Sequence, residues 1–220
     1  MKDYYIEHAK GGDPGAPLFP VEAAYDWMAY YSGNPVQKWW KRRIAKHVWN
    51  FLPPKTTKRL LDVGCGTSPI IRAYRGAVGI DRDPGKIEWM RFSQPDIHNT
   101  YLVHDIEKHP LPFDDGAFNG VICIEVLEHL ADPFEAIKEM ARVVNVGDFV
   151  ILATPDYSRW QWRLTERLYK RFKPGDYCDD HVTPLSLGLL NAQCSRYNLW
   201  IDDYRYVGGG DLVARFRKLG

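Results

Sequence analysis

Short apolar runs alternate with segments of helical periodicity over most of the chain. The first apolar run ends at Asp62. Four more follow at 77–80, 100–103, 120–124 and 147–153. Runs without regular polar positions are typical of parallel strands that are buried on both faces of a sheet. A short helix opening at Pro69 and longer helices over 84–92 and 134–143 are predicted between them, so strands and helices alternate as in an α/β domain.

The last part of the chain predicts a different arrangement. A helix over 185–197 is followed by strands over 199–206 and 212–217, and three glycines at 208–210 join the two strands. A glycine-rich connection between neighbouring strands indicates an antiparallel hairpin. The five parallel strands and this hairpin together predict a mostly parallel, seven-stranded sheet.

The segment before the first strand divides into two parts. Residues 1–20 lack periodicity and contain three glycines and three prolines, which predicts an arm without regular structure. Helices are expected over 21–31 and 35–52. The second helix has a basic face, formed by Lys38, Lys41, Arg42, Arg43 and Lys46. A solvated helix face is the ordinary interpretation, and contact with an anionic substrate or membrane is the alternative.

A glycine turn lies between the first two predicted strands. Gly64 and Gly66 let the backbone approach a ligand closely, since a side chain there would clash or forbid the turn. Asp81 ends the second strand and can accept hydrogen bonds from both hydroxyls of a ribose. These features predict an adenosine-binding half-site. Pro69 stands where a dinucleotide fingerprint has its third glycine, which argues against a nicotinamide or flavin cofactor but leaves an oxidoreductase as an alternative.

The heptapeptide Leu-Asp-Val-Gly-Cys-Gly-Thr at 61–67 closely resembles motif I of class I S-adenosylmethionine-dependent methyltransferases, and the resemblance extends from Arg59 to the end of the chain. Ser68 departs from a third glycine that is frequent in the family, and the following helix is short. The resemblance implies a Rossmann-like α/β fold with a C-terminal antiparallel hairpin. It also implies that residues 1–54 form an arm and helical cap on a main domain over 55–220.

The same resemblance assigns a set of cofactor-binding residues. The methionine part of S-adenosylmethionine would lie over the glycine turn, Asp81 would bind the ribose, and Asp105 and Ile106 would bind the adenine. Asp105 as a capping residue of its loop is the alternative. The full predicted set is Asp62, Gly64, Cys65, Gly66, Asp81, Arg82, Asp105, Ile106 and Ile124.

Composition limits the choice of partner and compartment. Lys plus Arg number 29 and Asp plus Glu 28, for a net charge of +1, so no global field favours nucleic acid. The four cysteines are scattered without a Cys-x-x-Cys pair, which favours a reducing cytoplasm. No apolar signal core opens the chain, and no apolar run is long enough to cross a bilayer.

A second group of polar residues follows the fourth predicted strand. If 125–130 is helical, Glu125 shares a face with both Glu128 and His129, and His181 is a further candidate downstream. Two carboxylates and imidazoles suit a divalent metal. The pattern resembles the metal site of small-RNA 2′-O-methyltransferases and of ubiquinone-biosynthesis O-methyltransferases. The alternative is metal-free, with these residues organising the helix start, and His129 as a lone general base is weaker because its geometry is not fixed.

An insert over 157–178 mixes aromatic and basic residues and is expected to form a lid. Such a helix can lie on a membrane surface or cover a hydrophobic or anionic substrate. The ordinary alternative is a lid whose aromatic residues pack on the core. Single-stranded RNA could also use these side chains, by stacking and phosphate contacts, although the nearly neutral chain makes nucleic acid a weaker candidate.

The predicted activity is therefore methyl transfer from S-adenosylmethionine to a small-molecule or lipid-like acceptor, with O-methylation as the favoured chemistry. A metal-dependent RNA 2′-O-methyltransferase and a non-catalytic S-adenosylmethionine-binding protein are the alternatives. The pattern identifies neither a catalytic residue nor the acceptor, the methylated atom or the oligomeric state.

Overall fold

The fold comes from a computed structural model that describes residues 25–31, 34–53, 59–93, 98–172 and 181–220. The predicted arm over 1–20 lies outside these residues. A single seven-stranded sheet has the order β3-β2-β1-β4-β5-β7-β6. The strands are β1 (Leu60–Val63), β2 (Val78–Asp81), β3 (Thr100–Val103), β4 (Phe118–Ile124), β5 (Val144–Pro155), β6 (Leu199–Val207) and β7 (Asp211–Lys218).

The first five strands pair in parallel, and β7 pairs antiparallel with both β5 and β6. This arrangement confirms the predicted mixed sheet and its closing hairpin. All four residues of β1 are buried, as expected of a strand covered on both faces. The antiparallel pairing has a further consequence, because it places Asp211, the first residue of β7, opposite Pro155 at the end of β5.

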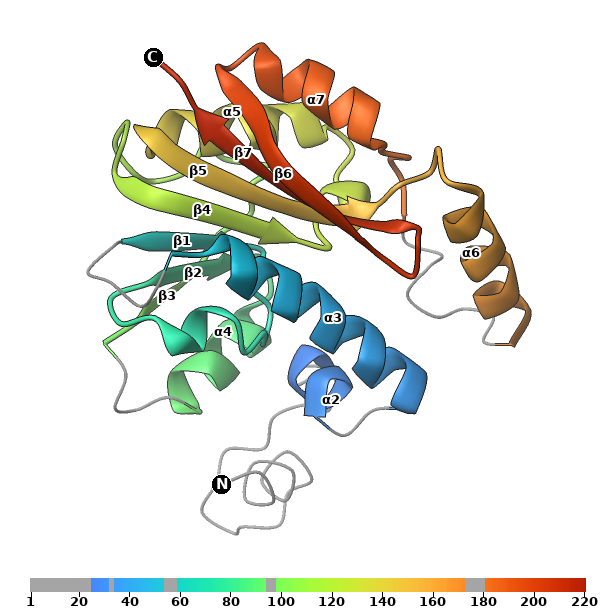
Figure 1. Cartoon of the computed structure of the whole chain (residues 1–220). Helices are drawn as coiled ribbons and strands as arrows, with labels where there is room; N and C mark the ends of the chain where they lie inside the picture. Colours follow the sequence, from blue (N-terminus) through green and yellow to red (C-terminus); the bar gives the residue numbers. More distant parts are fainter. Residues whose placement is uncertain (1–24, 32–33, 54–58, 94–97, 173–180) are drawn as a thin grey trace, which may run out of the picture.

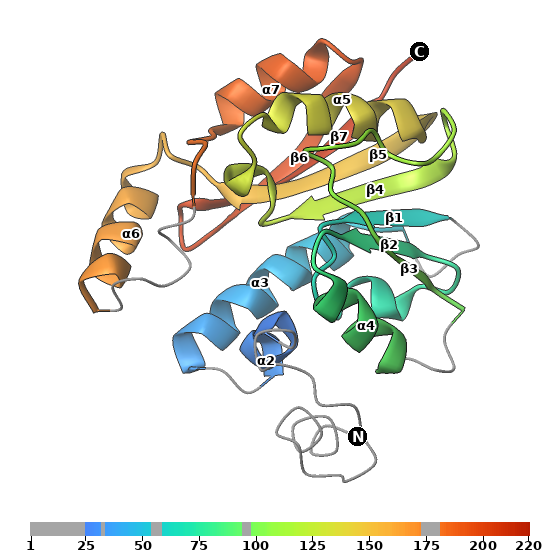
Figure 2. The same cartoon turned by 180° about the vertical axis from the view of Figure 1, so that it is seen from behind.

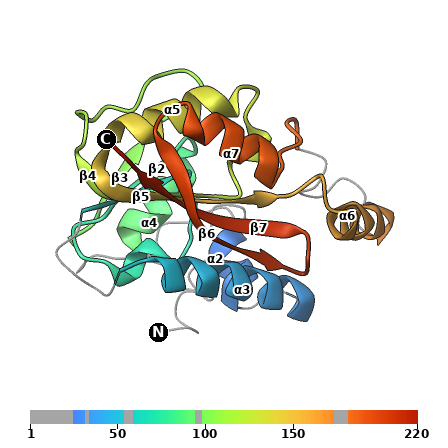
Figure 3. The ribbon, with the colours of Figure 1, turned by 45° about the horizontal axis from the view of Figure 1, so that its top comes forward.

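Helices cover both faces of the sheet (Figure 3). They are α2 (Tyr25–Tyr31), α3 (Pro35–Phe51), α4 (Pro84–Phe92), α5 (Pro133–Val143), α6 (Trp160–Phe172) and α7 (Leu187–Ser195). One apolar cluster joins α2, α3 and α4 to one face, and a second joins α5 and α7 to the other. The N-terminal helices α2 and α3 therefore share the core of the main domain.

Three caps fix where helices begin. Asn34, Asp83 and Asp132 each accept hydrogen bonds from backbone amides of the first turn, and a proline follows each of them. A side-chain oxygen at this position satisfies amides that have no intrahelical partner, and proline suits the first helical position. The cap at Asp83 matters for the site, because it starts α4 directly after the end of β2.

Two local predictions differ from the structure. The helix expected to open at Pro69 is only a 3-10 turn, Ile71–Ala73. Residues 67–77 separate Gly66 from β2, and among them only Ile71–Ala73 is helical. The basic face of α3 also divides: Arg42, Arg43 and Lys46 are exposed as predicted, whereas Lys41 lines a cavity.

Helix α6 lies to one side of the sheet, beyond the end of β5 (Figures 1 and 2). Its side chains divide between burial and exposure. Trp162 is buried, but Trp160, Leu164 and Leu168 are 64%, 48% and 49% exposed. The alternative in which the aromatic residues of the insert pack on the core therefore holds for Trp162. It does not hold for the exposed stripe of Trp160, Leu164 and Leu168. Within the described residues, no helix is both long and apolar enough to cross a membrane.

Candidate functional site

One cavity of about 890 Å³ opens at the carboxyl ends of β1, β2 and β4, with α2 and α3 on its other side. All nine residues predicted to bind the cofactor line it: Asp62, Gly64, Cys65, Gly66, Asp81, Arg82, Asp105, Ile106 and Ile124. They meet there because the carboxyl ends of parallel strands lie along one edge of the sheet. The same cavity continues past Ile124 to Glu125, Val126 and His129.

The glycine turn after β1 leaves no room for side chains. The amides of Gly64 and Cys65 donate to the Ile80 carbonyl at 2.8 and 2.9 Å, which attaches the turn to β2. Gly64 has a φ of +71°, and a Cβ there would lie 2.3 Å from Cγ2 of Val126. Gly66 has a φ of +47°, and its Cβ would lie 2.3 Å from Oδ2 of Asp26. Both positions therefore need glycine for conformation and for space.

Asp62 and Asp81 contribute two carboxylates to this part of the cavity. Oδ2 of Asp62 is buried without a hydrogen-bond partner among the described residues. Burial raises the pKa of Asp62 well above its usual range, and the charges of Asp81 and Asp26 raise it further. Asp81 is held by the backbone, since its Oδ2 accepts from the Gly66 amide at 2.8 Å and its Oδ1 from the Asp83 amide at 2.9 Å. Each oxygen keeps a lone pair that can accept from a ribose hydroxyl.

The adenine end of the predicted site follows β3. Oδ2 of Asp105 lies 2.9 Å from Nζ of Lys108, and Oδ1 accepts from the Glu107 amide at 3.1 Å. The hydrogen bond from Lys108 lowers the pKa of Asp105, so this carboxylate stays an acceptor. Arg82 is mostly exposed, and its Nη1 lies 3.7 Å from Oε2 of Glu107. The Asp105 side chain is thus a competent partner for an amino group, as well as a loop cap.

The segment after β4 is not an α-helix, so the condition for a shared face of Glu125, Glu128 and His129 is not met. Glu125 has a φ of +57°, and its amide donates to the Ala153 carbonyl at 2.8 Å, which continues the pairing of β4 with β5. A 3-10 turn, Leu127–His129, follows. Glu125 therefore does not share a helix face with Glu128 and His129, because the backbone reverses at Glu125 before the turn begins.

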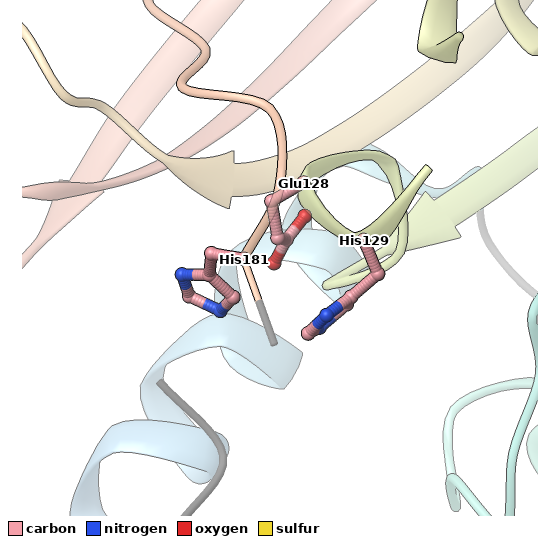
Figure 4. A group of neighbouring side chains, drawn as sticks. All are labelled: Glu128, His129 and His181. Carbon is pink, nitrogen blue, oxygen red and sulfur yellow. The ribbon is translucent and has the colours of Figure 1, made fainter. Parts of the chain in front are cut away.

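Three of the four predicted metal ligands still meet (Figure 4). Glu128, His129 and His181 each offer one ligand atom, and these atoms lie within 4.8 Å of one another. His181 is brought there by the backbone, because the amides of Val182 and Thr183 donate to the Glu128 carbonyl at 2.9 and 3.1 Å. Glu125 is not a member of this group.

Glu128 and His181 are each supported by neighbours. Glu128 is fully buried, its Oε2 accepts from Oγ1 of Thr154 at 2.9 Å, and its Oε1 has no hydrogen-bond partner among the described residues. Burial raises the pKa of Glu128 well above its usual range, and Glu125 raises it further. His181 stacks on Trp162 with ring centroids 6.1 Å apart, and its Nδ1 lies 2.8 Å from the Tyr157 hydroxyl. A buried carboxylate with a raised pKa beside two imidazoles can accept a proton or bind a cation.

The structure adds three charged residues that the sequence did not assign to the site. Asp211 is fully buried, and its Oδ2 accepts from Nε1 of Trp40 at 2.5 Å. Burial raises the pKa of Asp211, and the nearby Glu125 raises it further. The hairpin register contained a signal for Asp211, since the first residue of an antiparallel strand lies beside the end of its neighbour. Asp26 and Lys41 line the cavity from α2 and α3.

Comparison with known proteins agrees with this geometry. Residues 61–152 match a family model described as a methyltransferase domain. The chain is 34% identical over 102 residues to the ubiquinone biosynthesis O-methyltransferase of Alkalilimnicola ehrlichii, over 44% of this chain and 41% of that protein. It is 27% identical over 160 residues to the demethylmenaquinone methyltransferase of Staphylococcus haemolyticus, over 69% of this chain and 65% of that protein.

Similarity of the fold extends further than similarity of the sequence. A chain in the complex between the Haloferax volcanii Trm112 methyltransferase activator and a methyltransferase superposes with a TM-score of 0.70 at 17% identity, over 91% of this chain and 98% of that one. The present chain spans less than half the length of the first curated relative and about two thirds of the second. Residues 61–152 are thus similar in sequence to methyltransferase domains, and the fold as a whole is similar to that of a chain from this complex.

Proposed function

We propose that this chain transfers a methyl group from S-adenosylmethionine to an acceptor that binds at the ends of β4, β5 and β7. The continuity of the cavity carries the proposal. The glycine turn, Asp81 and Asp105 line the same space as Glu125 and His129, so a cofactor on one side and an acceptor on the other would meet near Ile124.

The residues present fit the cofactor. A ligand can lie against the backbone at Gly64 and Gly66, and Asp81 is oriented by two backbone amides to accept from a ribose. When bound, S-adenosylmethionine supplies a methyl group that its sulfonium already activates. The chain's own task is to hold both reactants in line and to exclude water, for which Ile124 and Val126 provide apolar walls.

The acceptor is proposed to be a small or lipid-like molecule that is methylated on oxygen. The relatives named above include an O-methyltransferase of ubiquinone biosynthesis. An oxygen acceptor attacks a methyl group after it loses its proton, and His129, which lines the cavity, offers a group that can take this proton when no cation is bound. Glu125 lines the same cavity, and its charge raises the pKa of the buried Asp211 nearby.

We further propose that Glu128, His129 and His181 hold a divalent cation. A carboxylate with an unpartnered buried oxygen and two imidazoles form a mixed oxygen and nitrogen ligand set, which suits Zn²⁺ or Mn²⁺. Three protein ligands would leave a position for an acceptor oxygen, whose pKa a cation lowers. Metal analysis of the purified protein and of Glu128→Gln tests this: bound metal in the parent and its loss in the variant are expected, and no metal in either rejects the proposal.

A peripheral contact with an anionic membrane surface is the proposed role of α6. The exposed stripe of Trp160, Leu164 and Leu168 lies on the same helix as the exposed Arg163, Arg167 and Arg171. Phosphatidylglycerol vesicles should sediment the parent chain more than phosphatidylcholine vesicles do. A Leu164→Ser, Leu168→Ser variant should lose this difference, and Val146→Ser, which changes an exposed apolar residue on β5, should keep it.

Calorimetry and an acceptor screen test the central proposal. S-adenosylmethionine and S-adenosylhomocysteine should bind, and NAD should not. Failure of both methionine ligands to bind would overturn the proposal. Quinol, phenol and lipid-like acceptors should then be screened with labelled cofactor, with and without chelator, because transfer to none of them would favour a non-catalytic binding protein.

A further inference from the structure

The N-terminal helices place an acid and a base over the glycine turn. Oδ2 of Asp26, on α2, accepts from the Thr67 amide at 3.4 Å, and the amide of Trp27 donates to Oγ1 of Thr67 at 3.2 Å. Nζ of Lys41, on α3, lies 3.9 Å from Oδ1 of Asp26. The Lys41 and Asp26 side chains are only 18% and 25% exposed, so water screens them poorly.

Lys41 is held on the inner face of its helix. The residues three, four and seven positions later, Ile44, Ala45 and Val48, are all buried in the core. Residues at this spacing share one helix face, so the packing of α3 directs Lys41 inward. Lys46 lies on the same helix but is exposed. The position of Lys41 therefore follows from the core packing of α3.

The charges in this corner of the cavity form a defined pattern. Asp62 and Asp26 both present carboxylates here; burial is the first cause of the raised pKa of Asp62, and the charges of Asp81 and Asp26 raise it further. Oδ2 of Asp62 is buried without a hydrogen-bond partner in the described part of the chain. Lys41 adds a positive charge beside Asp26. A ligand that carries an ammonium and a carboxylate on neighbouring atoms matches this pattern, because each charge would meet its opposite.

We propose that Asp26 and Lys41 bind the amino-acid end of the cofactor, with Lys41 on the α-carboxylate and Asp26, together with Asp62, on the α-ammonium. This inference rests on the proposed function, which supplies the cofactor. It gives α2 and α3 a role beyond covering the cavity. Each helix contributes one charged side chain, and the two pair with the ammonium and the carboxylate that an adenosine fragment lacks. It also links the docking of these helices to cofactor binding.

An ion pair that only fastens α2 to α3 is the competing explanation. The two explanations differ in which ligands respond to a substitution. A structural ion pair would affect every ligand of the cavity alike, because its loss would disturb the cavity as a whole. A binding role would affect only ligands that carry the amino-acid end. Three ligands separate these cases: S-adenosylhomocysteine, its decarboxylated form, which keeps the amine, and 5′-methylthioadenosine, which has neither group.

Calorimetry with the three ligands tests the proposal on the parent chain, Lys41→Met, Asp26→Asn and the control Lys46→Met. Lys41→Met should weaken S-adenosylhomocysteine about 10- to 100-fold, as expected for the loss of a charged hydrogen bond, and should leave the other two ligands unchanged. Asp26→Asn should weaken both ligands that carry the amine and leave 5′-methylthioadenosine unchanged. Lys46→Met, which removes the same charge from the outer face of α3, should bind all three as the parent does.

The outcomes separate two kinds of failure. If the parent binds all three ligands and Lys41→Met binds S-adenosylhomocysteine as well as the parent does, the inference is overturned and the proposed function stands. Equal weakening of all three ligands would also overturn it, in favour of the structural ion pair. If the parent binds neither S-adenosylmethionine nor S-adenosylhomocysteine, the proposed function itself fails. Unchanged binding of 5′-methylthioadenosine shows in the same experiment that a variant is folded.

Discussion

The cofactor half and the acceptor half of the cavity are built in different ways. The predicted ligands of the cofactor half come from one continuous stretch and lie near the carboxyl end of a parallel strand or directly after it: Asp62, Gly66, Asp81 and Asp105. The residues beside the acceptor half, Glu128, His181 and Asp211, instead come from segments that are far apart in the chain. Backbone amides orient Asp81 and Asp105 locally, whereas Glu128 depends on Thr154 and on the backbone at 182–183.

This difference teaches where each half obtains its precision. In the cofactor half, sheet geometry alone aligns the ligands, because consecutive strands end at the same edge. In the acceptor half, alignment depends on four separate features. They are the left-handed backbone of Glu125, the 3-10 turn at Leu127–His129, the register of β7 on β5, and the backbone at 182–183, which donates to the Glu128 carbonyl. Substitutions can therefore test whether the two halves are independent.

The largest effect is expected at Gly64, where the halves touch. Gly64→Ala should lower the free energy of unfolding by about 2–5 kcal/mol, from left-handed strain and from overpacking against Val126. Gly76→Ala is the matched control, because Gly76 has a φ of +73° against +71° at Gly64 but no atom within 4 Å of its Cβ position. Chemical denaturation should show that Gly76→Ala lowers the free energy of unfolding by about 1–2 kcal/mol. Equal losses in the two variants would show that Val126 does not restrict the turn.

A smaller effect should separate the halves. Asp81→Ala should weaken S-adenosylhomocysteine by about 1–3 kcal/mol, because the ribose hydroxyls and the Gly66 amide lose their acceptor. The metal content should stay equal to that of the parent, since Asp81 is not a member of the Glu128 group. Calorimetry and metal analysis of the same preparation measure both quantities. An unchanged affinity would contradict the role of Asp81, and a changed metal content would contradict the independence of the halves.

The most gradual effect is a pH dependence that originates in the cofactor half. The pKa of Asp62 is raised on folding, so the folded chain holds a proton that the unfolded chain releases above a pH of about 4. Its contribution to stability is complete below that pH and is lost as the pH rises through the folded-state pKa, by up to about 1.4 kcal/mol per pH unit. Without ligand, Asp62→Asn should lose less stability than the parent between pH 4 and 7 in denaturation experiments. Parallel curves for the two proteins would show that Asp62 does not titrate in this way.

The limits of prediction follow the same division. The strands β1 to β3, the glycine turn after β1 and the acidic residues at the strand ends were all predicted. Apolar strands and glycines with left-handed backbone leave local signals in the sequence. The shared helix face considered for Glu125, Glu128 and His129 does not form, because a left-handed residue such as Glu125 leaves no such signal when it is not glycine. Lys41 was placed on a basic face, although its spacing from Ile44 and Val48 would have turned it inward.

The sequence by itself determined the order of strands and helices, the class of cofactor and the edge of the sheet at which it would bind. These properties depend on local periodicity and on residues close to each other in the chain. Only the tertiary structure decided that Glu128, His129 and His181 meet without Glu125, that Asp211 lies near Glu125, and that Asp26 and Lys41 lie over the glycine turn. The physical reason is that each of these arrangements depends on the packing of segments far apart in the chain, and local patterns do not record that packing.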